Sequence, residues 1–301
     1  MKKIVLTGGT GFVGKNLINH FRKDECYEIE NLDFRKDLPN KLAPFHSLIH
    51  LAGKAHDLKK VAKPEEYFEV NYEKTKVLYD LFLASEGKDF IYFSSVKAVT
   101  DTLSAELFED YEPNPKTAYG QSKLKAEQYL LSQPIPDNRR LFILRPCMIH
   151  GPGNKGNLNL LYNLVNKGVP YPLGAFANKR SFLSVSNLIY IVERIINELT
   201  IPSGTYNLAD DRPVSTNELI KIIAISSASA GQIWNLPKKI TSGIARLGDV
   251  LHLPLNSETL KKLTESYVVS NQKLKTALGI NQLPLSAEDG LAKTIESFKS
   301  R

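Results

Sequence analysis

Cysteine and long apolar runs are both scarce in this chain of 301 residues. Its two cysteines, Cys26 and Cys147, are too few for a disulfide framework and are typical of a reducing compartment. No uncharged apolar run approaches the length that crosses a bilayer, and the apolar stretch at residues 4–6 is too short for a signal peptide. We therefore expect a cytoplasmic protein without a membrane partner.

Low-complexity tracts and internal repeats are also missing from the sequence. The composition, 42% hydrophobic and 24% charged, is that of one large α/β domain or of one domain with a smaller lobe. The formal net charge of +7 by itself suggests nucleic-acid binding, but the lysines are dispersed in pairs with acidic residues between them. We expect no nucleic-acid partner and no metal site, and a modest positive bias suits a diphosphate-bearing substrate.

The first half of the chain alternates short apolar runs with helical stretches, which predicts a parallel sheet flanked by helices. The expected strands read KIVLT, YEIENLD, SLIHLAG, DFIYFSS and RRLFILRP. Helices are expected over residues 64–85 and 117–131. After Pro146 the sequence becomes richer in turns, and its last part is mostly helical.

A glycine-rich segment, TGGTGFVG, directly follows the first expected strand and opens a helix. Gly8, Gly11 and Gly14 have the spacing of a dinucleotide-binding loop, in which glycines allow a tight turn and close approach of a pyrophosphate to a helix N-terminus. The predicted cofactor site also includes the other residues of this loop, Thr10, Phe12 and Val13.

Asp33 stands at the end of the second expected strand. A carboxylate there accepts hydrogen bonds from the adenosine ribose and repels a 2′-phosphate, which favours NAD, while Arg35 keeps NADP open. Together these features predict an α/β protein with a Rossmann-type doubly wound parallel sheet. We place the dinucleotide-binding domain at residues 1–150 and a smaller, mainly substrate-binding lobe, partly interleaved with the sheet, at 151–301.

Two tyrosine–lysine pairs have a spacing of four residues: Tyr72 with Lys76, and Tyr119 with Lys123. Such residues share one helix face, so the spacing also fits an ordinary surface pair. Only the second pair follows a strand that ends in a serine, Ser95, and the carboxyl edge of the sheet brings that serine towards the helix. A neighbouring ammonium group lowers the pKa of a phenol, and a serine can hydrogen-bond the reacting oxygen. The second set is therefore predicted to move protons.

Taken in order, the segments TGGTGFVG, HLAG, NYEKT, SSVK, YGQSK, RPCMIHGPG, RSFLSVSNL and VVSNQKLKTALGI resemble an extended short-chain dehydrogenase/reductase of the NAD-dependent epimerase/dehydratase family, nearly end to end. The resemblance implies an NAD-dependent enzyme in which Tyr119 is the general base. It also implies that Lys123 lowers the pKa of Tyr119 and holds the nicotinamide ribose, and that Ser95 positions the sugar.

The resemblance implies further binding residues along the chain. For the cofactor they are Asp37 and Leu38 beside the adenine, Leu51, Ala52, Gly53 and Lys54 along the pyrophosphate and ribose, Asn71 as a support for these loops, and Pro146 and Met148 near the nicotinamide. For the diphosphate of the substrate they are Asn157 and Leu158 at a helix start, Arg180 as a clamp, and Arg246 as a candidate second clamp. We interpret Cys147 as a packing residue, not as a nucleophile.

Within the family, HLAGKAH, KGNLNLL and NKRSFLSVSNL resemble the UDP-sugar branch, near the 4-epimerases and the 4-keto-6-deoxy-N-acetylhexosamine reductases of surface-polysaccharide synthesis. We expect a 4-epimerase that acts by hydride transfer at C4 of a UDP-hexose or UDP-N-acetylhexosamine, such as UDP-glucose or UDP-GlcNAc. An NAD(P)H-dependent reductase uses the same residues and stays an alternative. A non-catalytic NAD(P)-binding sensor or scaffold is a third, which the retained Tyr119 and Lys123 disfavour.

The sequence departs from the family pattern near the expected sugar site. Val96 and Lys97 stand where dehydratases have an Asp-Glu pair, so a dehydratase is disfavoured. Residues 98–100 replace the usual VYG, Ser186 stands where an aspartate is common, and Ile280 stands where a tryptophan usually follows LG. By analogy with the family, the helices over residues 64–85 and 117–131 would join two copies into a homodimer.

Overall fold

The structure, a computed structural model, describes the whole chain except residues 35, 37, 55–62, 155–156, 252–255 and 300–301. Its centre is a six-stranded parallel sheet in the order β2-β1-β3-β4-β5-β8. The strands are β1 Lys2–Thr7, β2 Tyr27–Leu32, β3 Ser47–His50, β4 Asp89–Phe93, β5 Arg140–Pro146 and β8 Gly204–Leu208. The order reverses between β1 and β3, and ligands bind at such a switch point in open α/β sheets.

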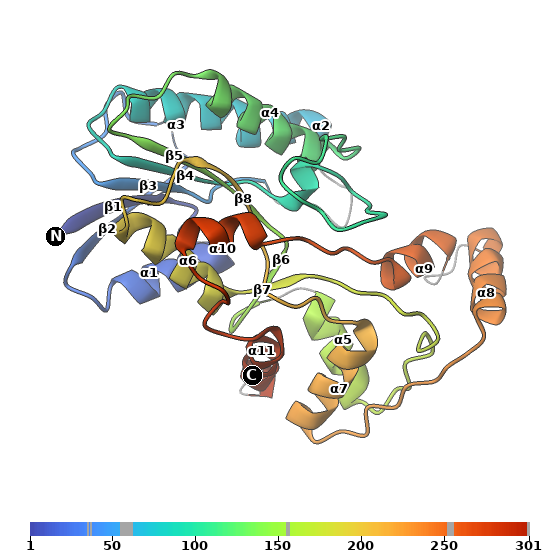
Figure 1. Ribbon diagram of the computed structural model, residues 1–301. Helices are drawn as coiled ribbons and strands as arrows, with labels where there is room; N and C mark the ends of the chain where they lie inside the picture. The colour runs from blue at the N-terminus through green and yellow to red at the C-terminus, as the bar shows by residue number, and fades with distance from the viewer. Residues whose placement is uncertain (35, 37, 55–62, 155–156, 252–255, 300–301) are drawn as a thin grey trace.

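Helices cover both faces of this sheet (Figure 1). One face carries α2 Pro64–Phe68, the π-helical turn Glu69–Glu73, α3 Lys74–Leu83 and α4 Ala118–Ser132. The other carries α1 Phe12–Phe21, α6 Val185–Asn197 and α10 Gln272–Leu278. Because successive side chains of a strand point to opposite faces, Val5 packs towards the first group, and Ile4 and Leu6 pack towards the second.

The smaller lobe has its own apolar core, formed by α5 Asn157–Asn166, α7 Thr216–Ser227 and α11 Ala287–Lys299. A two-stranded parallel ribbon of β6 Met148–His150 and β7 Phe182–Ser184 connects it to the sheet. Two further helices, α8 Lys238–Leu251 and α9 Ser257–Thr264, extend to the outer end of the lobe (Figure 1).

The expected fold class and the expected strands are confirmed. The helix expected over residues 64–85 is present, but it contains the π-helical turn, and the helix expected from residue 117 begins at Ala118 with Thr117 as its cap. Three elements of the second half, β8, α6 and α10, belong to the central sheet and its cover. The domain division at residue 150 stays a prediction. Among the described helices, none combines the length and apolar character that a membrane crossing requires.

Candidate active site

The glycine turn after β1 requires glycine at several positions because a Cβ there would collide with neighbouring atoms of the protein. Gly8 has φ +77°, and a Cβ on it would lie 2.7 Å from the backbone nitrogen of Ala52. A Cβ on Gly14 would lie 2.3 Å from the carbonyl oxygen of Gly8, whereas one on Gly11 would lie at 3.3 Å. Gly11 is the N-cap residue of α1 and has no side chain to satisfy the first N–H groups of the helix. The turn therefore suits a pyrophosphate at a helix N-terminus.

Gly9 also needs to be a glycine, for a reason that lies on the neighbouring strand. Its N–H donates a hydrogen bond to Asn31 Oδ1 at 3.1 Å, and a Cβ on Gly9 would lie 2.3 Å from that oxygen. Asp33 follows β2 directly, and its contact with the ribose stays a prediction. Arg35 and Asp37 lie outside the described residues. Leu38 packs against the apolar cluster under α3 and α4, so a packing role accounts for it.

The predicted catalytic residues come together at the carboxyl edge of the sheet. Ser95 follows β4, and its Oγ accepts a hydrogen bond from the N–H of Lys97 at 3.2 Å. Tyr119 lies in the first turn of α4, which begins where the Thr117 Oγ1 accepts from the N–H of Gly120 at 3.2 Å. The hydroxyl of Ser95 lies close enough to the phenol of Tyr119 to lower its pKa, against the larger effect of burial. The structure thus places a serine hydroxyl against the phenol of the helix, as the sequence predicts.

Lys123, one turn further along α4, is 4% exposed. Its Nζ donates to the carbonyl oxygen of Phe93 at 2.8 Å and lies 4.8 Å from the centre of the Tyr92 ring. Burial lowers the pKa of Lys123 to about 8, against an opposing effect of Glu127. This ammonium group therefore loses its charge more readily than an exposed lysine does.

The pKa of Tyr119 is raised, and this differs from the expected lowering by Lys123. Desolvation of the hydroxyl is the largest cause, the hydrogen bond with Ser95 opposes it, and the nearby Tyr67 raises the pKa further. The rings of Tyr67 and Tyr119 meet edge-on with centroids 6.4 Å apart. The neutral phenol is therefore the stable form of Tyr119 in this structure at neutral pH.

The loop after β3 is held by Asn71, which is fully buried in the π-helical turn. Its Oδ1 accepts from the N–H of Lys54 at 2.7 Å, and its Nδ2 donates to the carbonyl of Lys54 at 3.1 Å and to Ser122 Oγ at 3.0 Å. A Cβ on Gly53 would lie 2.8 Å from Asn71 Oδ1 and 3.2 Å from Lys123 Nζ. The predicted supporting role of Asn71 agrees with this geometry, and Gly53 brings the loop against the lysine.

Lys54 was expected to contact the cofactor, but its side chain pairs with a residue of α2. Its ammonium group forms an ion pair with Glu66 and lies 5.8 Å from the centre of the Tyr67 ring. This pairing lowers the pKa of Glu66. The contact of Lys54 with the loop is thus through its backbone, while its charge is directed to α2.

The other residues of the β3 and β5 ends occupy the expected places along the sheet edge. Ala52 donates its N–H to Thr7 Oγ1 at 3.2 Å, and Leu51 and Ala52 follow β3 beside the glycine turn. Pro146 ends β5 and Met148 begins β6. Cys147 packs against the main apolar cluster, and burial raises the pKa of its thiol well above the usual value, which agrees with a packing role.

On the substrate side, Arg180 lies in the segment before β7 and is partly buried. Its Nε donates to the carbonyl of Glu265 at 3.2 Å, and burial lowers the pKa of its guanidinium group. Its backbone pairs with Val214, so two segments of the small lobe hold it in place. Leu158 is buried in the core of the small lobe, and its predicted substrate contact stays a prediction. The side chain of Asn157 lies outside the described part of the structure.

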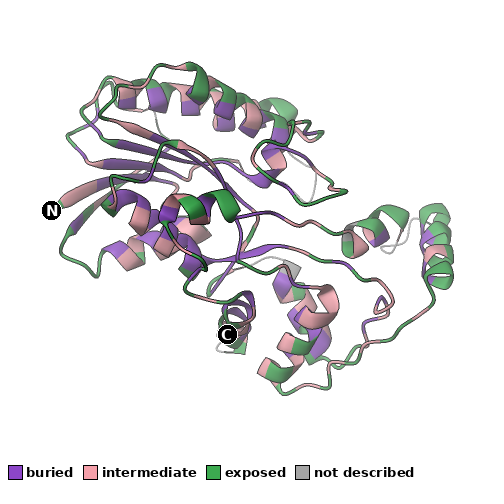
Figure 2. Ribbon diagram, viewed as in Figure 1, coloured by how far each residue is buried: buried purple, intermediate pink, exposed green. Residues whose placement is uncertain are grey.

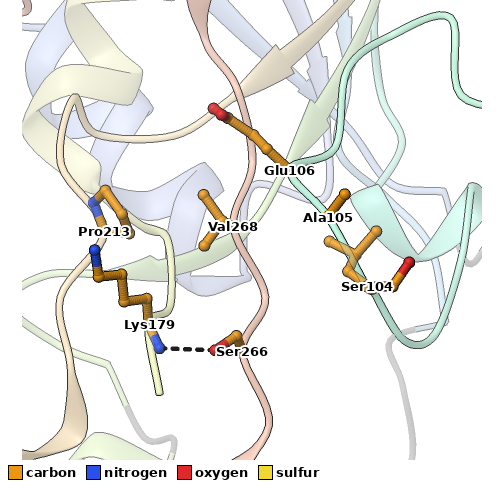
Figure 3. Close-up of a pocket in the computed structure, with 8 residues that line it drawn as sticks. Ser104, Ala105, Glu106, Lys179, Pro213, Ser266 and Val268 are labelled. Carbon is orange, nitrogen blue, oxygen red and sulfur yellow. Dashed lines mark hydrogen bonds between the residues drawn. The ribbon is translucent and has the colours of Figure 1, made fainter. Parts of the chain in front are cut away.

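An open depression of about 440 Å³ is lined in part by Lys179, the residue before Arg180 (Figure 3). Its lining comes from residues 103–106 on one side and from Lys179, Pro213, Ser266 and Val268 on the other. The N–H of Lys179 donates to Ser266 Oγ at 3.0 Å across its floor. Arg246 lines a different depression, on α8, so the structure does not bring this candidate clamp to the other substrate residues.

Tyr267 contacts the loop at residues 98–100, where the sequence differs from the family pattern. Its hydroxyl donates to the carbonyl of Thr100 at 2.8 Å. Lys97 Nζ lies 4.2 Å from the centre of the Tyr267 ring and donates to the carbonyl of Asp101 at 2.8 Å. The loop after Ser95 is therefore tied to the small lobe through a tyrosine and a lysine.

The first tyrosine–lysine pair is a surface pair. Lys76 Nζ lies 5.5 Å from the ring centre of Tyr72 and 5.4 Å from that of Tyr129, and it also forms an ion pair with Glu73 at 3.6 Å. Tyr72 and Tyr129 also pack against the apolar cluster under α3 and α4. The surrounding residues, not the spacing, distinguish this pair from the candidate catalytic pair of Tyr119 and Lys123.

Comparison with known proteins places the chain in a family. The model of the NAD dependent epimerase/dehydratase family matches residues 4–209. The UDP-glucose 4-epimerase of Vibrio cholerae is 30% identical over 99% of this chain and 95% of its own length. The chain belongs to the NAD dependent epimerase/dehydratase family. The predicted family, the enzyme class and the dependence on NAD are therefore confirmed.

Two further matches agree with this family. A relative from Escherichia coli O157:H7, N-acetyl-alpha-D-glucosaminyl-diphospho-ditrans,octacis-undecaprenol 4-epimerase, is 26% identical over 97% of this chain and 94% of its own length. The structure of the UDP-glucuronic acid 4-epimerase of Bacillus cereus in complex with NAD superimposes with a TM-score of 0.75 at 18% identity, over 99% of both chains. The latter shows that the fold is shared.

Several residues that shape this epimerase/dehydratase site have no simple sequence signal. His50 is fully buried, with Nδ1 2.7 Å from Thr7 Oγ1 and Nε2 2.9 Å from Thr75 Oγ1. Burial holds the pKa of His50 well below its usual value, so the ring is a neutral link between β1, β3 and α3. Asn31 and Tyr67 were not predicted either. A polar residue at the end of an expected buried strand, as in SLIH, is the one signal that points to His50.

Proposed function

We propose that this protein is a 4-epimerase of a UDP-hexose or UDP-N-acetylhexosamine, with NAD as its cofactor. The observation that carries the proposal is the juxtaposition of Ser95 at the end of β4 with Tyr119 in the first turn of α4, with Lys123 one turn away and the glycine turn at the same sheet edge. The near full-length match to a protein named UDP-glucose 4-epimerase supports the UDP-sugar and the position C4.

The residues of the glycine turn fit the cofactor, because added Cβ atoms at Gly8, Gly9 and Gly14 would collide with backbone or with Asn31. Bound there, NAD supplies the hydride acceptor and donor. Asp33 would accept hydrogen bonds from the adenosine ribose, Lys123 would hold the nicotinamide ribose, and Asn71 would keep the loop at Gly53 in place.

The proton chemistry belongs to Tyr119. In the proposed reaction Tyr119 acts as the phenolate, which the positive charges of Lys123 and of bound oxidised NAD would favour over the resting phenol. Its oxygen takes the proton of the sugar O4 while C4 is oxidised, and it returns that proton when C4 is reduced on the other face. Ser95 hydrogen-bonds both the phenol and the reacting oxygen, so it keeps the two within transfer distance. Arg180 is the proposed contact of the diphosphate, since a guanidinium group binds phosphate oxygens in pairs.

A reductase of a UDP-4-keto sugar is the second candidate, and one observation favours it. Burial raises the pKa of Tyr119, so the resting phenol carries the proton that a ketone needs when it accepts a hydride. Both reactions use the same residues. They differ in whether reduced cofactor is consumed.

A direct assay separates the two candidates. We expect purified protein to convert UDP-glucose or UDP-GlcNAc to the C4 epimer without net consumption of cofactor. Stoichiometric loss of NADH or NADPH with a UDP-4-keto-6-deoxy sugar, and no epimer from the first substrates, would instead establish the reductase. A polyprenyl-diphospho-linked N-acetylhexosamine belongs in the same panel, because the E. coli relative is named for such a carrier. Absence of turnover with every substrate would contradict an enzymatic role.

We also propose a homodimer formed through the outer side of α3 and α4. Val77 and Leu131 are 50% and 59% exposed on these helices, which supports a partly apolar contact. Light scattering during gel filtration tests this proposal, and a monomeric mass at micromolar protein would contradict it.

A further inference from the structure

Helix α8 presents an apolar stripe to solvent in the described structure. Four residues that recur once per helical turn and are 46–57% exposed form the stripe: Ile240, Ile244, Leu247 and Leu251. A neighbouring stripe of the same helix is buried and consists of Thr241, Ala245 and Gly248. Figure 2 shows α8 as a largely exposed helix at the outer end of the small lobe. The exposed stripe is therefore not the side that attaches α8 to the rest of the protein.

The side of α8 next to the stripe is basic. Lys238, Lys239 and Arg246, with Ser242 and Gly243, line a depression of about 390 Å³. On a helical wheel, Lys239 and Arg246 lie together next to the exposed Val250, so the cations flank the apolar sector of the helix.

The one acidic residue of this helix, Asp249, interacts with Arg246, but three cations against one carboxylate leave α8 with a net positive charge. Asp249 accepts hydrogen bonds from the Ser257 N–H at 2.9 Å and from its Oγ at 2.5 Å, and thereby attaches α8 to the start of α9. The depression itself is lined by cationic and small residues alone. Its charge is complementary to phosphate groups.

We propose that α8 docks this protein on an anionic membrane surface, with the stripe at the acyl boundary and Lys239 and Arg246 among the lipid phosphates. A helix that confines its apolar residues to one face and carries basic residues on its polar face is the kind that lies in a bilayer interface. The proposal concerns peripheral docking, not a membrane crossing, and it revises the expectation of no membrane partner. It does not depend on which sugar the active site takes.

A second copy of the chain fits the stripe less well. Two copies that pack stripe against stripe would keep Lys239 and Arg246 outside the contact, so these cations would gain no anionic partner there. An anionic surface meets the same side chains with opposite charge.

The test is co-sedimentation of the full chain with vesicles. We expect the protein to pellet with vesicles of phosphatidylglycerol and phosphatidylcholine, to stay in solution with phosphatidylcholine alone, and to be released by high salt. The double variant Lys239→Glu with Arg246→Glu should weaken partitioning by at least about thirtyfold, since each cation near an anionic leaflet contributes about fivefold.

The apolar part needs its own variant and a matched control. Ile244→Glu with Leu247→Glu should abolish pelleting, whereas Leu199→Glu with Ile225→Glu, at sites 74% and 83% exposed elsewhere, should pellet like the wild type. Turnover of a dissolved substrate should be unchanged in the stripe variant, which shows that it is folded and keeps this test separate from that of the active site.

Three results would overturn the proposal: wild-type protein that remains in the supernatant with anionic vesicles, equal loss of pelleting in the control variant, or a wild-type dimer that Ile244→Glu with Leu247→Glu dissociates. The last result would show that a second copy covers the stripe.

Discussion

The side-chain amide of Asn71 hydrogen-bonds both backbone polar groups of Lys54, at 2.7 Å to the N–H and at 3.1 Å to the carbonyl. The same amide donates to Ser122 on α4 at 3.0 Å. One buried side chain therefore connects the loop after β3 to the helix that carries Tyr119 and Lys123. A π-helical turn at Asn71 is in keeping with the frequent use of such turns at functional sites.

Replacement of Asn71 by alanine should weaken cofactor binding and stability together. Asn71→Ala leaves the N–H and carbonyl of Lys54 without their partners, and we expect a loss of about 2–3 kcal/mol in the free energy of unfolding. Urea unfolding and titration with NAD measure the two effects. Asn197→Ala, which removes hydrogen bonds with Tyr27 and Lys2 at the opposite end of the fold, should leave NAD affinity unchanged. Equal NAD affinity in both variants would refute the supporting role of Asn71.

Removal of one hydroxyl group should stop catalysis with little effect on binding. Tyr119→Phe lacks the group that takes the O4 proton, and we expect kcat to fall by about 10³-fold, within the range for lost general acid–base catalysis, with cofactor affinity nearly intact. Tyr72→Phe is the matched control from the surface pair and should keep full activity. Steady-state kinetics decide, and a Tyr119→Phe enzyme with wild-type kcat would remove Tyr119 from the mechanism.

The glycine turn should tolerate no methyl group at Gly14. In Gly14→Ala the Cβ would lie 2.3 Å from the carbonyl oxygen of Gly8, so the turn must shift and NAD binding should be lost or weakened by at least about 100-fold, the effect of a misplaced binding group. Gly243→Ala is the control, because a Cβ there meets open space within a helix and should stabilise the protein by roughly 0.5–1 kcal/mol. Isothermal titration with NAD measures the change in cofactor affinity, and thermal unfolding measures the change in stability. Unaltered NAD affinity in Gly14→Ala would show that the cofactor binds elsewhere.

Lys123 should make the protein more stable as the pH rises above about 8. Burial lowers its pKa from 10.5 to about 8, so between these values the unfolded chain binds a proton that the folded chain does not, and the free energy of unfolding increases with pH. The increase is at most about 3 kcal/mol. Lys123→Met should lack it and should be more stable than the wild type near pH 7.

Urea unfolding near pH 7 and near pH 10 measures this difference. Lys125→Met, at an exposed lysine of the same helix, is the control and should follow the wild-type pH dependence. If Lys123→Met kept the wild-type slope, the charge of Lys123 would not be suppressed by burial.

The central strands could be predicted because they are buried on both faces. All four residues of β3 and all five of β4 are buried, and such strands read as continuous apolar runs in the sequence. The catalytic set could be predicted because its parts depend on local order: a strand that ends in Ser95 and a helix that begins with Tyr119. Parallel pairing then brings the two ends to one edge.

Other features depend on contacts that no local pattern records. The ion pair of Lys54 with Glu66, the burial of Leu158 and the position of Arg246 on a distant helix each follow from tertiary packing. The raised pKa of Tyr119 also follows from tertiary packing. The spacing to Lys123 is visible in the sequence, but the desolvation that outweighs it is not.

Strand β8 comes late in the chain, yet it is the only partner of one edge of β5 among the described residues, with Phe142 opposite Gly204 and Pro146 opposite Leu208. During synthesis that edge of β5 stays unpaired until residue 208 has left the ribosome. A shortened polypeptide that ends near residue 150 would keep an apolar strand edge open to other chains, and open edges promote aggregation. Cotranslational completion of the nucleotide-binding sheet thus has to wait for the second half of the polypeptide.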